Sequence, residues 1–286
     1  MRQFVTPLRY PGGKGRLTQF VADLMSNNKL EGGHYIEPYA GGAGVAMSLL
    51  MLEYASHAHI NDLNRSVHAF WKAVLEDTDS LCSLISRNRV SMAEWNRQRA
   101  VQQDQHADTL EIAYSTFFLN RTNRSGILLG GVIGGKAQRG EWKLNARFNK
   151  KDMIGRIEKI ASFRHRISLY NLDAAQLIEN ILPTIPRRSL VYLDPPYYVK
   201  GKGLYEDHYQ HQDHAGIAKL VSKIEQPWIV SYDNVPQIRK LYSEFRRRTF
   251  GLNYSAQNRY EGKEVMFFSD GLEIPKELIP SRAQAA

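Results

Sequence analysis

The sequence predicts an α/β fold with a mainly parallel sheet, interrupted in the middle of the chain by a mostly helical insertion. Short apolar segments alternate with segments of helical periodicity in residues 1–65, and the alternation returns from residue 166 onward. Residues 66–165 break this alternation with consecutive helical patterns and a stretch rich in glycine and arginine. We therefore expect one α/β domain formed by residues 1–65 and 166–286, with an inserted domain at residues 66–165.

The individual elements follow from hydrophobic periodicity. Apolar residues three and four apart predict helices, and short β-branched or aromatic runs predict strands. In the α/β part, this predicts strands at 34–39, 57–64, 166–171, 189–194, 227–233 and 263–270, and helices at 16–27, 44–55, 174–180 and 214–224. In the insertion, helices are expected at 67–77, 93–103 and 108–120, followed by a loop or hairpin at 121–140.

Positive charge is concentrated in one part of the chain. The formal net charge is +9, and the segment from Leu119 to Arg166 contains 12 Lys or Arg against 3 Asp or Glu. The rest of the chain is neutral. Because Lys and Arg that displace counterions supply most non-specific affinity for nucleic acids, this segment predicts a phosphate-binding surface. A solvated basic face is the alternative.

The composition argues against several classes of protein. A single cysteine, Cys82, excludes an intramolecular disulfide framework and a cysteine-rich metal site. No apolar run is long enough to cross a bilayer, and the N-terminal stretch lacks the apolar core of a signal peptide. We interpret the nearby His208, His211 and His214 as a polar loop and helix start, and predict no metal site. A soluble, cytoplasmic protein is expected.

Four acidic residues fall at the carboxyl ends of predicted strands: Glu37, Asp62, Asp173 and Asp194. In open parallel sheets, ligands bind outside the carboxyl ends of the strands. Any one of these acids could simply be a helix N-cap, but four on a common edge predict a binding site. Asp62 suits a ligand with a ribose, because a carboxylate can accept hydrogen bonds from both hydroxyls.

Two glycine-rich stretches accompany the acids. "EPYAGGAG" places Gly41, Gly42 and Gly44 between a strand and an apolar helix, where the backbone can approach a cofactor closely. The spacing is not GxGxxG, which disfavours a dinucleotide oxidoreductase, and no Lys-Ser/Thr follows, which excludes a P-loop. "RYPGGKG" near the N-terminus adds Tyr10 and Lys14.

The stretches "RYPGGK", "EPYAGGAG", "IND" and "DPPYY", in that order, resemble the Dam-type (D12 class) DNA adenine-N6 methyltransferases. The resemblance also covers "FFLNRTNRSG" and "NRYEGKEVMFFS" and so spans nearly the whole chain. It implies a Rossmann-like class I methyltransferase fold, with residues 1–65 and 166–286 as the catalytic domain that binds S-adenosyl-L-methionine, and residues 66–165 as a target-recognition domain. The implied substrate is double-stranded DNA.

The resemblance also implies roles for individual residues. The catalytic residues would be Asp194, Pro195, Pro196 and Tyr197. The cofactor would be bound by Tyr10, Lys14, Glu37, Gly41, Gly42, Gly44, Asp62, Asp173 and Asp194. Two departures from the family pattern stand out: Tyr10-Pro11 replaces the Trp-Ala of many relatives, and the cofactor loop reads GGAG where relatives often read GxGS.

The Asp-Pro-Pro-Tyr segment suits the methylation of an amine. The exocyclic amine of adenine is a poor nucleophile, because its lone pair is delocalised into the ring. Asp194 and the carbonyl of Pro195 can each accept one of its N–H groups, and two prolines hold both acceptors in place. Tyr197 would stack on the base. Since a base inside a duplex cannot reach such a pocket, the adenine must be flipped out.

The basic insertion supplies the expected DNA contacts. The candidates are Arg121, Asn123, Arg124, Lys136, Arg139, Lys143 and Arg147. Arg and Asn can read the edges of guanine and adenine, but they also contact phosphates frequently, so both roles stay open for each residue. The recognition sequence is open as well.

Other functions fit parts of the pattern. An RNA adenine-N6 methyltransferase would use the same charge and motifs, and related motifs serve enzymes that methylate cytosine N4 or glutamine side chains. A glutamine-directed enzyme would not need the basic insertion. A nucleic-acid-binding module without turnover is disfavoured by the intact motifs. The pattern is compatible with a restriction or defence partner protein and with association with the nucleoid through DNA, and it leaves the oligomeric state open.

Overall fold

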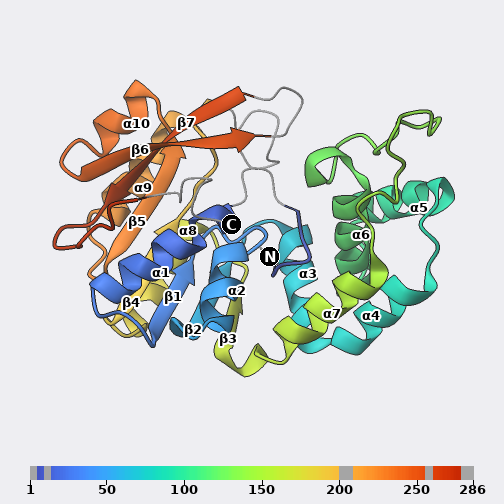
Figure 1. Cartoon of the computed structure of the whole chain (residues 1–286), viewed down its shortest axis with the longest axis horizontal. Coiled ribbons are helices and arrows are strands. Elements are labelled where there is room, and N and C mark those ends of the chain that lie inside the picture. The colour runs from blue at the N-terminus through green and yellow to red at the C-terminus, as the bar shows by residue number, and fades with distance from the viewer. Residues whose placement is uncertain (1–4, 10–13, 200–208, 255–259, 278–286) are drawn as a thin grey trace.

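The protein is built around one twisted sheet, seen in a computed structural model (Figure 1). The structure describes residues 5–9, 14–199, 209–254 and 260–277, with the backbone alone for 252–254 and 260–263. The seven-stranded sheet has the order β3-β2-β1-β4-β5-β7-β6. Its strands are β1 (Gly33–Glu37), β2 (Ala55–Asn61), β3 (Ile167–Tyr170), β4 (Ser189–Leu193), β5 (Trp228–Asp233), β6 (Arg246–Tyr254) and β7 (Tyr260–Phe268).

The strand order creates a switch point between β1 and β4. β1 pairs in parallel with β2 and with β4, and further parallel pairs join β2 to β3 and β4 to β5. β7 runs antiparallel between β5 and β6. The chain therefore leaves β1 in one direction and continues from β4 in the other, which is where open α/β sheets bind ligands. The predicted α/β fold with a mainly parallel sheet is confirmed.

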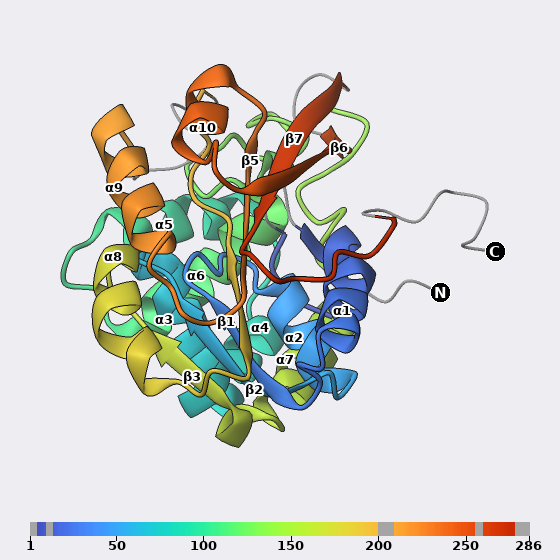
Figure 2. The same ribbon diagram turned by 90° about the vertical axis from the view of Figure 1, so that its left-hand side faces the viewer.

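Helices cover both faces of the sheet. Tyr35 belongs to the apolar core on the face of α1 (Thr18–Asn27) and α2 (Gly44–Met51), whereas its neighbour Ile36 belongs to the core on the other face. That second face is covered by α8 (Ala174–Gln176), α9 (His211–Val221) and α10 (Pro236–Leu241), as Figure 2 shows. Strands buried on both faces explain the nearly continuous apolar runs in the sequence.

The insertion consists of helices at one side of the sheet (Figure 1). They are α3 (Arg65–Glu76), α4 (Thr78–Arg87), α5 (Met92–Gln103), α6 (Thr109–Thr122) and α7 (Lys150–Ala161). Asp108 and Glu111 form a capping box at the start of α6, which satisfies two backbone N–H groups. Trp71 of α3 and Phe117 of α6 share one apolar core with Tyr35 of the sheet, so the core continues from the sheet into the insertion.

Several elements differ from the expectation. α4, α7 and α10 were not predicted, and neither was β6, whose sequence begins with three arginines. Arg246 and Arg248 donate hydrogen bonds to backbone carbonyls of the C-terminal segment, so these charges cover an edge strand. The expected loop or hairpin at 121–140 contains one isolated bridge, between Asn123 and Val132. Short 3-10 helices, η1 (Lys14–Leu17), η2 (Arg124–Gly126), η3 (Arg164–Arg166) and η5 (Leu182–Thr184), and a π-helical segment, η4 (Leu177–Ile181), are also present.

Within the described ranges, no helix combines the length and the apolar character that crossing a membrane requires.

Candidate active site

The four acids lie in a row along one edge of the sheet. Glu37 is the last residue of β1, Asp62 and Asp194 directly follow β2 and β4, and Asp173 comes three positions after β3. These four strands are parallel neighbours, so their carboxyl ends meet at one edge. Glu37 and Asp194 flank the switch point between β1 and β4.

Asp194 is held by residues from two distant segments. The Nζ atom of Lys14 lies 2.9 Å from each of its carboxylate oxygens. The hydroxyl of Ser231, on β5, donates to Oδ1 at 2.6 Å. The side chain of Asp194 remains 26% exposed, whereas that of Lys14 is 5% exposed. The carboxylate is therefore braced on its buried side and open on the other.

Tyr197 is fixed through its hydroxyl. This hydroxyl accepts a hydrogen bond from Lys14 Nζ at 3.0 Å and donates to Oε1 of Glu264, on β7, at 2.5 Å. Burial alone lowers the pKa of Lys14, but Asp194, Tyr197 and Glu264 outweigh it and leave that pKa raised. Lys14 is therefore a buried cation that joins the N-terminal motif to the end of β4.

The chain after the two prolines is anchored to β5. The carboxylate of Asp233 accepts hydrogen bonds from the backbone N–H groups of Tyr198 and Val199, at 2.9 and 3.0 Å. Ser231 and Asp233 are two residues apart on one strand, so they lie on the same face of the sheet. Together they brace the Asp-Pro-Pro-Tyr segment at both ends.

Glu37 is buried beneath the first turn of α2. Its Oε1 atom accepts hydrogen bonds from the hydroxyl of Tyr35 at 3.1 Å and from the backbone N–H of Ala46 at 3.2 Å. Burial raises the pKa of Glu37 to about 8, although both hydrogen bonds oppose the shift. In the free protein this side chain is therefore mostly protonated at neutral pH.

Replacing Glu37 with glutamine is expected to stabilise the free protein at alkaline pH. Unfolded Glu37 loses its proton near pH 4.5 and folded Glu37 near pH 8, so stability falls as the pH rises between these values. The variant lacks this loss, on the order of a few kcal/mol, and its amide oxygen can still accept from Ala46. Urea unfolding at about pH 5 and about pH 8.5 measures the difference, and a pH-independent difference would contradict the assignment.

The glycine-rich turn is tied to the neighbouring strand by Asp62. Its Oδ2 atom accepts from the backbone N–H of Gly41 at 2.8 Å, and Oδ1 accepts from the N–H of Asn64 at 3.0 Å. The carbonyl of Gly41 accepts from the indole of Trp71 at 2.9 Å. Gly41 has a φ of 47°, in the left-handed region that favours glycine. Asp62 thus links the two loops that border the carboxyl ends of β1 and β2.

The remaining predicted cofactor residues differ in what the structure shows. Asp173 caps α8, because its Oδ1 accepts from the N–H of Ala175 at 2.8 Å. Gly42 lies in the turn that leads into α2, and Gly44 is the first residue of that helix. Tyr10 lies outside the described residues. Among the residues that are described, no group of three or more His, Cys, Asp or Glu could hold a metal ion.

A family comparison identifies the class of protein. The family model for D12 class N6 adenine-specific DNA methyltransferases matches residues 10–256, which include Lys14, the four acids and the Asp-Pro-Pro-Tyr segment. The chain belongs to this family. It is therefore an enzyme that methylates adenine in DNA, and it requires a methyl donor.

Two curated proteins resemble the methyltransferase along most of their length. The type II methyltransferase M.MjaIII of Methanocaldococcus jannaschii is 23% identical, over 83% of this chain and 88% of its own. The retron Ec67 DNA adenine methylase of Escherichia coli is 26% identical, over 84% of this chain and 81% of its own.

Solved structures of methyltransferases are more distant. A putative RNA methyltransferase, PH1948 from Pyrococcus horikoshii, aligns with a TM-score of 0.44 and 11% identity, over 92% of this chain and 86% of that one. The rRNA methyltransferase aviRa from Streptomyces viridochromogenes aligns with a TM-score of 0.36 and 10% identity, over 87% and 82%.

Five of the seven candidate DNA-binding residues of the methyltransferase have exposed side chains: Arg124, Lys136, Arg139, Lys143 and Arg147. They lie on or near the long connection between α6 and α7. Gln138 braces this connection: its Nε2 donates to the carbonyls of Ile133 and Gly135, both at 2.7 Å, and its Oε1 accepts from the N–H of Leu144 at 2.9 Å. The exposed charges are therefore carried by a loop with its own internal hydrogen bonds.

The other two candidates are engaged inside the protein. Asn123 is 0% exposed, accepts from the indole of Trp95 and donates to the carbonyls of Ile127 and Leu128. Its amide is thus occupied in shaping the loop, which argues against a direct DNA contact. Arg121 is half-buried and donates to the carbonyl of Arg147 at 2.7 Å. Burial and then the nearby Arg9 lower the pKa of Arg121 to about 10.

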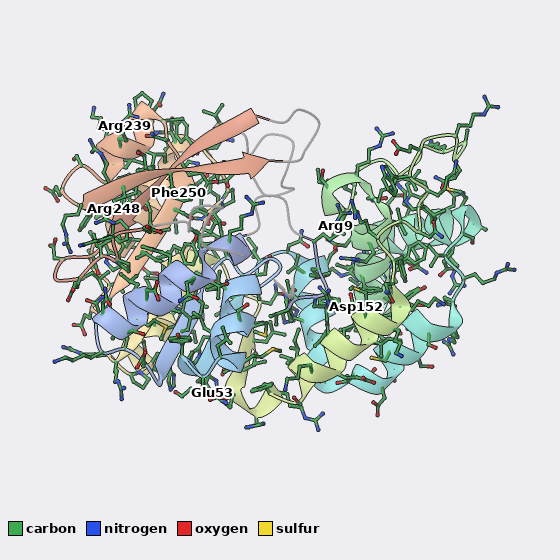
Figure 3. The ribbon with its side chains drawn as sticks, viewed as in Figure 1. Arg9, Glu53, Asp152, Arg239, Arg248 and Phe250 are labelled. Carbon is green, nitrogen blue, oxygen red and sulfur yellow. The ribbon has the colours of Figure 1, made fainter. Side chains whose placement is uncertain are left out.

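The "FFLNRTNRSG" stretch holds the N-terminal segment in place. Asn120 accepts from the N–H of Arg9 and donates to its carbonyl, both at 2.7 Å, as one strand would pair with another. A Cβ atom on Gly126 would lie within 2.3 Å of the same carbonyl, so the position requires glycine. Arg9 consequently lies on the side of α6 that faces the sheet (Figure 3). The stretch positions the segment that leads into the "GGK" motif.

Sequence reasoning missed five residues that the structure places at the site or on the basic loop: Arg9, Trp142, Ser231, Asp233 and Glu264. The three on the sheet come from β5 and β7. Ser231 and Asp233 lie outside the recognised motifs, and Glu264 lies within the stretch "NRYEGKEVMFFS", where nothing marked it among its neighbours. Trp142 is 63% exposed on the basic loop, which is unusual for so large an apolar side chain. A solvent-facing tryptophan between charged residues was the one signal in the sequence that could have found it.

Proposed function

We propose that the methyl donor is S-adenosyl-L-methionine and that the acceptor is the N6 amine of an adenine flipped out of double-stranded DNA. The observation that carries this proposal is the state of Asp194. Its carboxylate lies at the switch point of the sheet, is held by Lys14 and Ser231, and is open on its other side. A fixed acceptor at such a position suits an amine that gains positive charge.

The edge of the sheet has groups that suit the donor. When bound, S-adenosyl-L-methionine supplies an electrophilic methyl group. Asp62 would bind its ribose hydroxyls, and Glu37 with Gly41, Gly42 and Gly44 would line its methionine and ribose side. Asp173 would lie near its adenine, and Tyr10 and Lys14 would complete the site from the N-terminal motif. A row of acidic side chains is compatible with a ligand that carries positive charge on its sulfonium and ammonium groups.

The acceptor would be clamped between two hydrogen-bond acceptors and a ring. Asp194 and the carbonyl of Pro195 would each accept one N–H of the amine, with Pro196 keeping the backbone rigid. Because the hydroxyl of Tyr197 is engaged by Lys14 and Glu264, the ring face is the part that would stack on the base. Tyr197 is 4% exposed, so the proposal requires its surroundings to move aside when the base enters.

The DNA would bind over the loop between α6 and α7. We propose that the exposed Lys136, Arg139 and Lys143 contact phosphates, and that Arg124 and Arg147 contact either phosphates or base edges. Trp142 would add an apolar contact, of the kind that other DNA-binding proteins insert next to a distorted base step. These contacts would offset the few kcal/mol that base flipping requires.

Arg9 and Arg121 mark a second place for a phosphate. Burial, followed by the charge of Arg147, lowers the pKa of Arg9, and burial, followed by the charge of Arg9, lowers the pKa of Arg121. Asp152, a carboxylate that opposes the lowering of the pKa of Arg121, is already paired with Arg156 at 2.8 Å. A phosphate between these arginines would relieve their mutual repulsion.

Incubation with methyl-labelled S-adenosyl-L-methionine tests the proposal. Parallel reactions contain double-stranded DNA, single-stranded DNA, RNA or no nucleic acid. We expect label in double-stranded DNA above all. Label in RNA alone would make the enzyme an RNA methyltransferase, and label in the protein without nucleic acid would indicate a side-chain substrate. Binding of S-adenosyl-L-methionine without any transfer would support a binding module and contradict the proposal.

A further inference from the structure

The last described strand of the sheet contributes a buried carboxylate to the site. Glu264 pairs with Asp233 of β5 and with Phe250 of β6, which places it at the carboxyl end of β5. Its side chain is 1% exposed. It lies within the stretch "NRYEGKEVMFFS", but nothing in the sequence distinguishes it there as a site residue. A buried carboxylate without a function would destabilise the folded protein, since burial disfavours the charged form.

Glu264 contacts both residues that surround Asp194. Its Oε1 atom accepts the hydroxyl proton of Tyr197 at 2.5 Å, and its Oε2 atom lies 3.5 Å from Lys14 Nζ. Oε2 makes an ion pair at that distance but no hydrogen bond with any described residue. The Nζ atom of Lys14 is also within 5.1 Å of the centre of the Tyr197 ring. Glu264 thus fixes both the tilt of the ring and the position of the ammonium group.

The charges of Lys14, Asp194 and Glu264 explain why the site has a second carboxylate beside Asp194. Lys14 alone would neutralise Asp194, and a neutral pair attracts the developing positive charge of an amine less strongly than a free carboxylate does. Glu264 balances Lys14, so the group of three carries a net negative charge. Low exposure of Lys14 and Glu264 keeps solvent from screening this charge.

We propose that Glu264 is a positioning residue for methyl transfer: it holds the Tyr197 ring and balances Lys14, so that Asp194 stays negative toward the adenine amine. The proposal rests on the clamp described under the proposed function. Glu264 touches neither the base nor the donor in this arrangement. It acts through Tyr197 and Lys14.

The ionisation of Glu264 provides a specific signature. Burial raises its pKa above 4.5, Lys14 opposes the shift, and Asp194 adds to it. Because the proposed role requires the charged form, kcat should fall as the pH drops through this raised value. A glutamine at this position cannot titrate. The pH-rate profile of the variant should therefore lack this fall in kcat at low pH, which we call the acid limb.

The test compares single-turnover rates of the full-length wild type, Glu264→Gln and Glu264→Asp, with S-adenosyl-L-methionine and DNA both saturating. We expect Glu264→Gln to be slower by about 10- to 100-fold, with unchanged binding of both ligands and an unchanged melting temperature. Glu264→Asp, which keeps the charge, should recover part of the rate and the acid limb. A wild-type rate and acid limb in Glu264→Gln would overturn the proposal.

Two further variants make the result decisive. Glu53→Gln removes a carboxylate from an exposed ion pair with Arg166, before β2 and far from the strand ends that carry the acids, and should keep the wild-type rate (Figure 3). If Glu264→Gln does not fold, Tyr197→Phe removes the hydroxyl that Glu264 holds but keeps the ring. A wild-type rate in that variant would equally overturn the proposal. An active Asp194→Ala enzyme would instead contradict the clamp itself.

Discussion

Replacing Asp194 with alanine is expected to lower kcat by about 10²- to 10³-fold, in the range found when one preorganised group is removed from an active site. The variant loses the acceptor that faces the amine, and it leaves Lys14 with Glu264 as its remaining carboxylate partner among the described residues. Binding of DNA should persist, because the basic loop is untouched. Single-turnover kinetics with saturating DNA and donor measures the effect.

Asp194→Asn separates charge from shape at the same position. Asparagine keeps the size of the side chain and one oxygen acceptor but not the negative charge. We expect it to be nearly as slow as the alanine variant if charge dominates, because its amide would also face the donors Lys14 and Ser231. Asp79→Ala, an exposed change in the first turn of α4, serves as the control and should keep the wild-type rate. An alanine variant with a wild-type rate would contradict the role of Asp194.

The second large effect is expected on DNA affinity. Combined replacement of Lys136, Arg139 and Lys143 with alanine removes three exposed charges from the loop between α6 and α7. If each contacts a phosphate, affinity should fall by roughly 10- to 100-fold at moderate salt, and the slope of log K against log salt should decrease by about 2.7. Fluorescence anisotropy with a labelled duplex across a salt series measures both quantities.

The control for this experiment removes the same number of charges elsewhere. Arg187, Lys219 and Lys223 are exposed and lie outside the insertion. Their combined replacement with alanine should leave the salt slope close to that of the wild type. Equal effects of the two triple variants would mean that the net charge, and not the loop, determines binding.

The row of acids could be predicted from the sequence because it depends on local patterns. Each acid lies at or within three residues of the carboxyl end of a short strand, and parallel neighbouring strands place their carboxyl ends on one edge. Lys14 was also found, through its glycine-rich context. The elements that were missed lacked such patterns: β6 begins with charged residues that bind backbone carbonyls, and so it does not read as a strand.

The residues behind Asp194 could not be predicted, because they depend on contacts between distant parts of the chain. Ser231 and Glu264 lie on β5 and β7, and only the strand order brings them to Asp194 and Tyr197. Whether a polar side chain is buried also depends on contacts between distant parts of the chain. Asn123 resembles a base-reading side chain in the sequence, but Trp95 and the loop carbonyls occupy its amide.

The most direct test of this account is a nucleoside analysis of DNA treated with the enzyme and S-adenosyl-L-methionine. DNA without prior methylation is incubated with the wild type or with Asp194→Ala, digested to nucleosides, and analysed by mass spectrometry. The account predicts N6-methyladenine from the wild type and little or none from the variant. N4-methylcytosine as the product, or equal amounts of N6-methyladenine from both proteins, would contradict it.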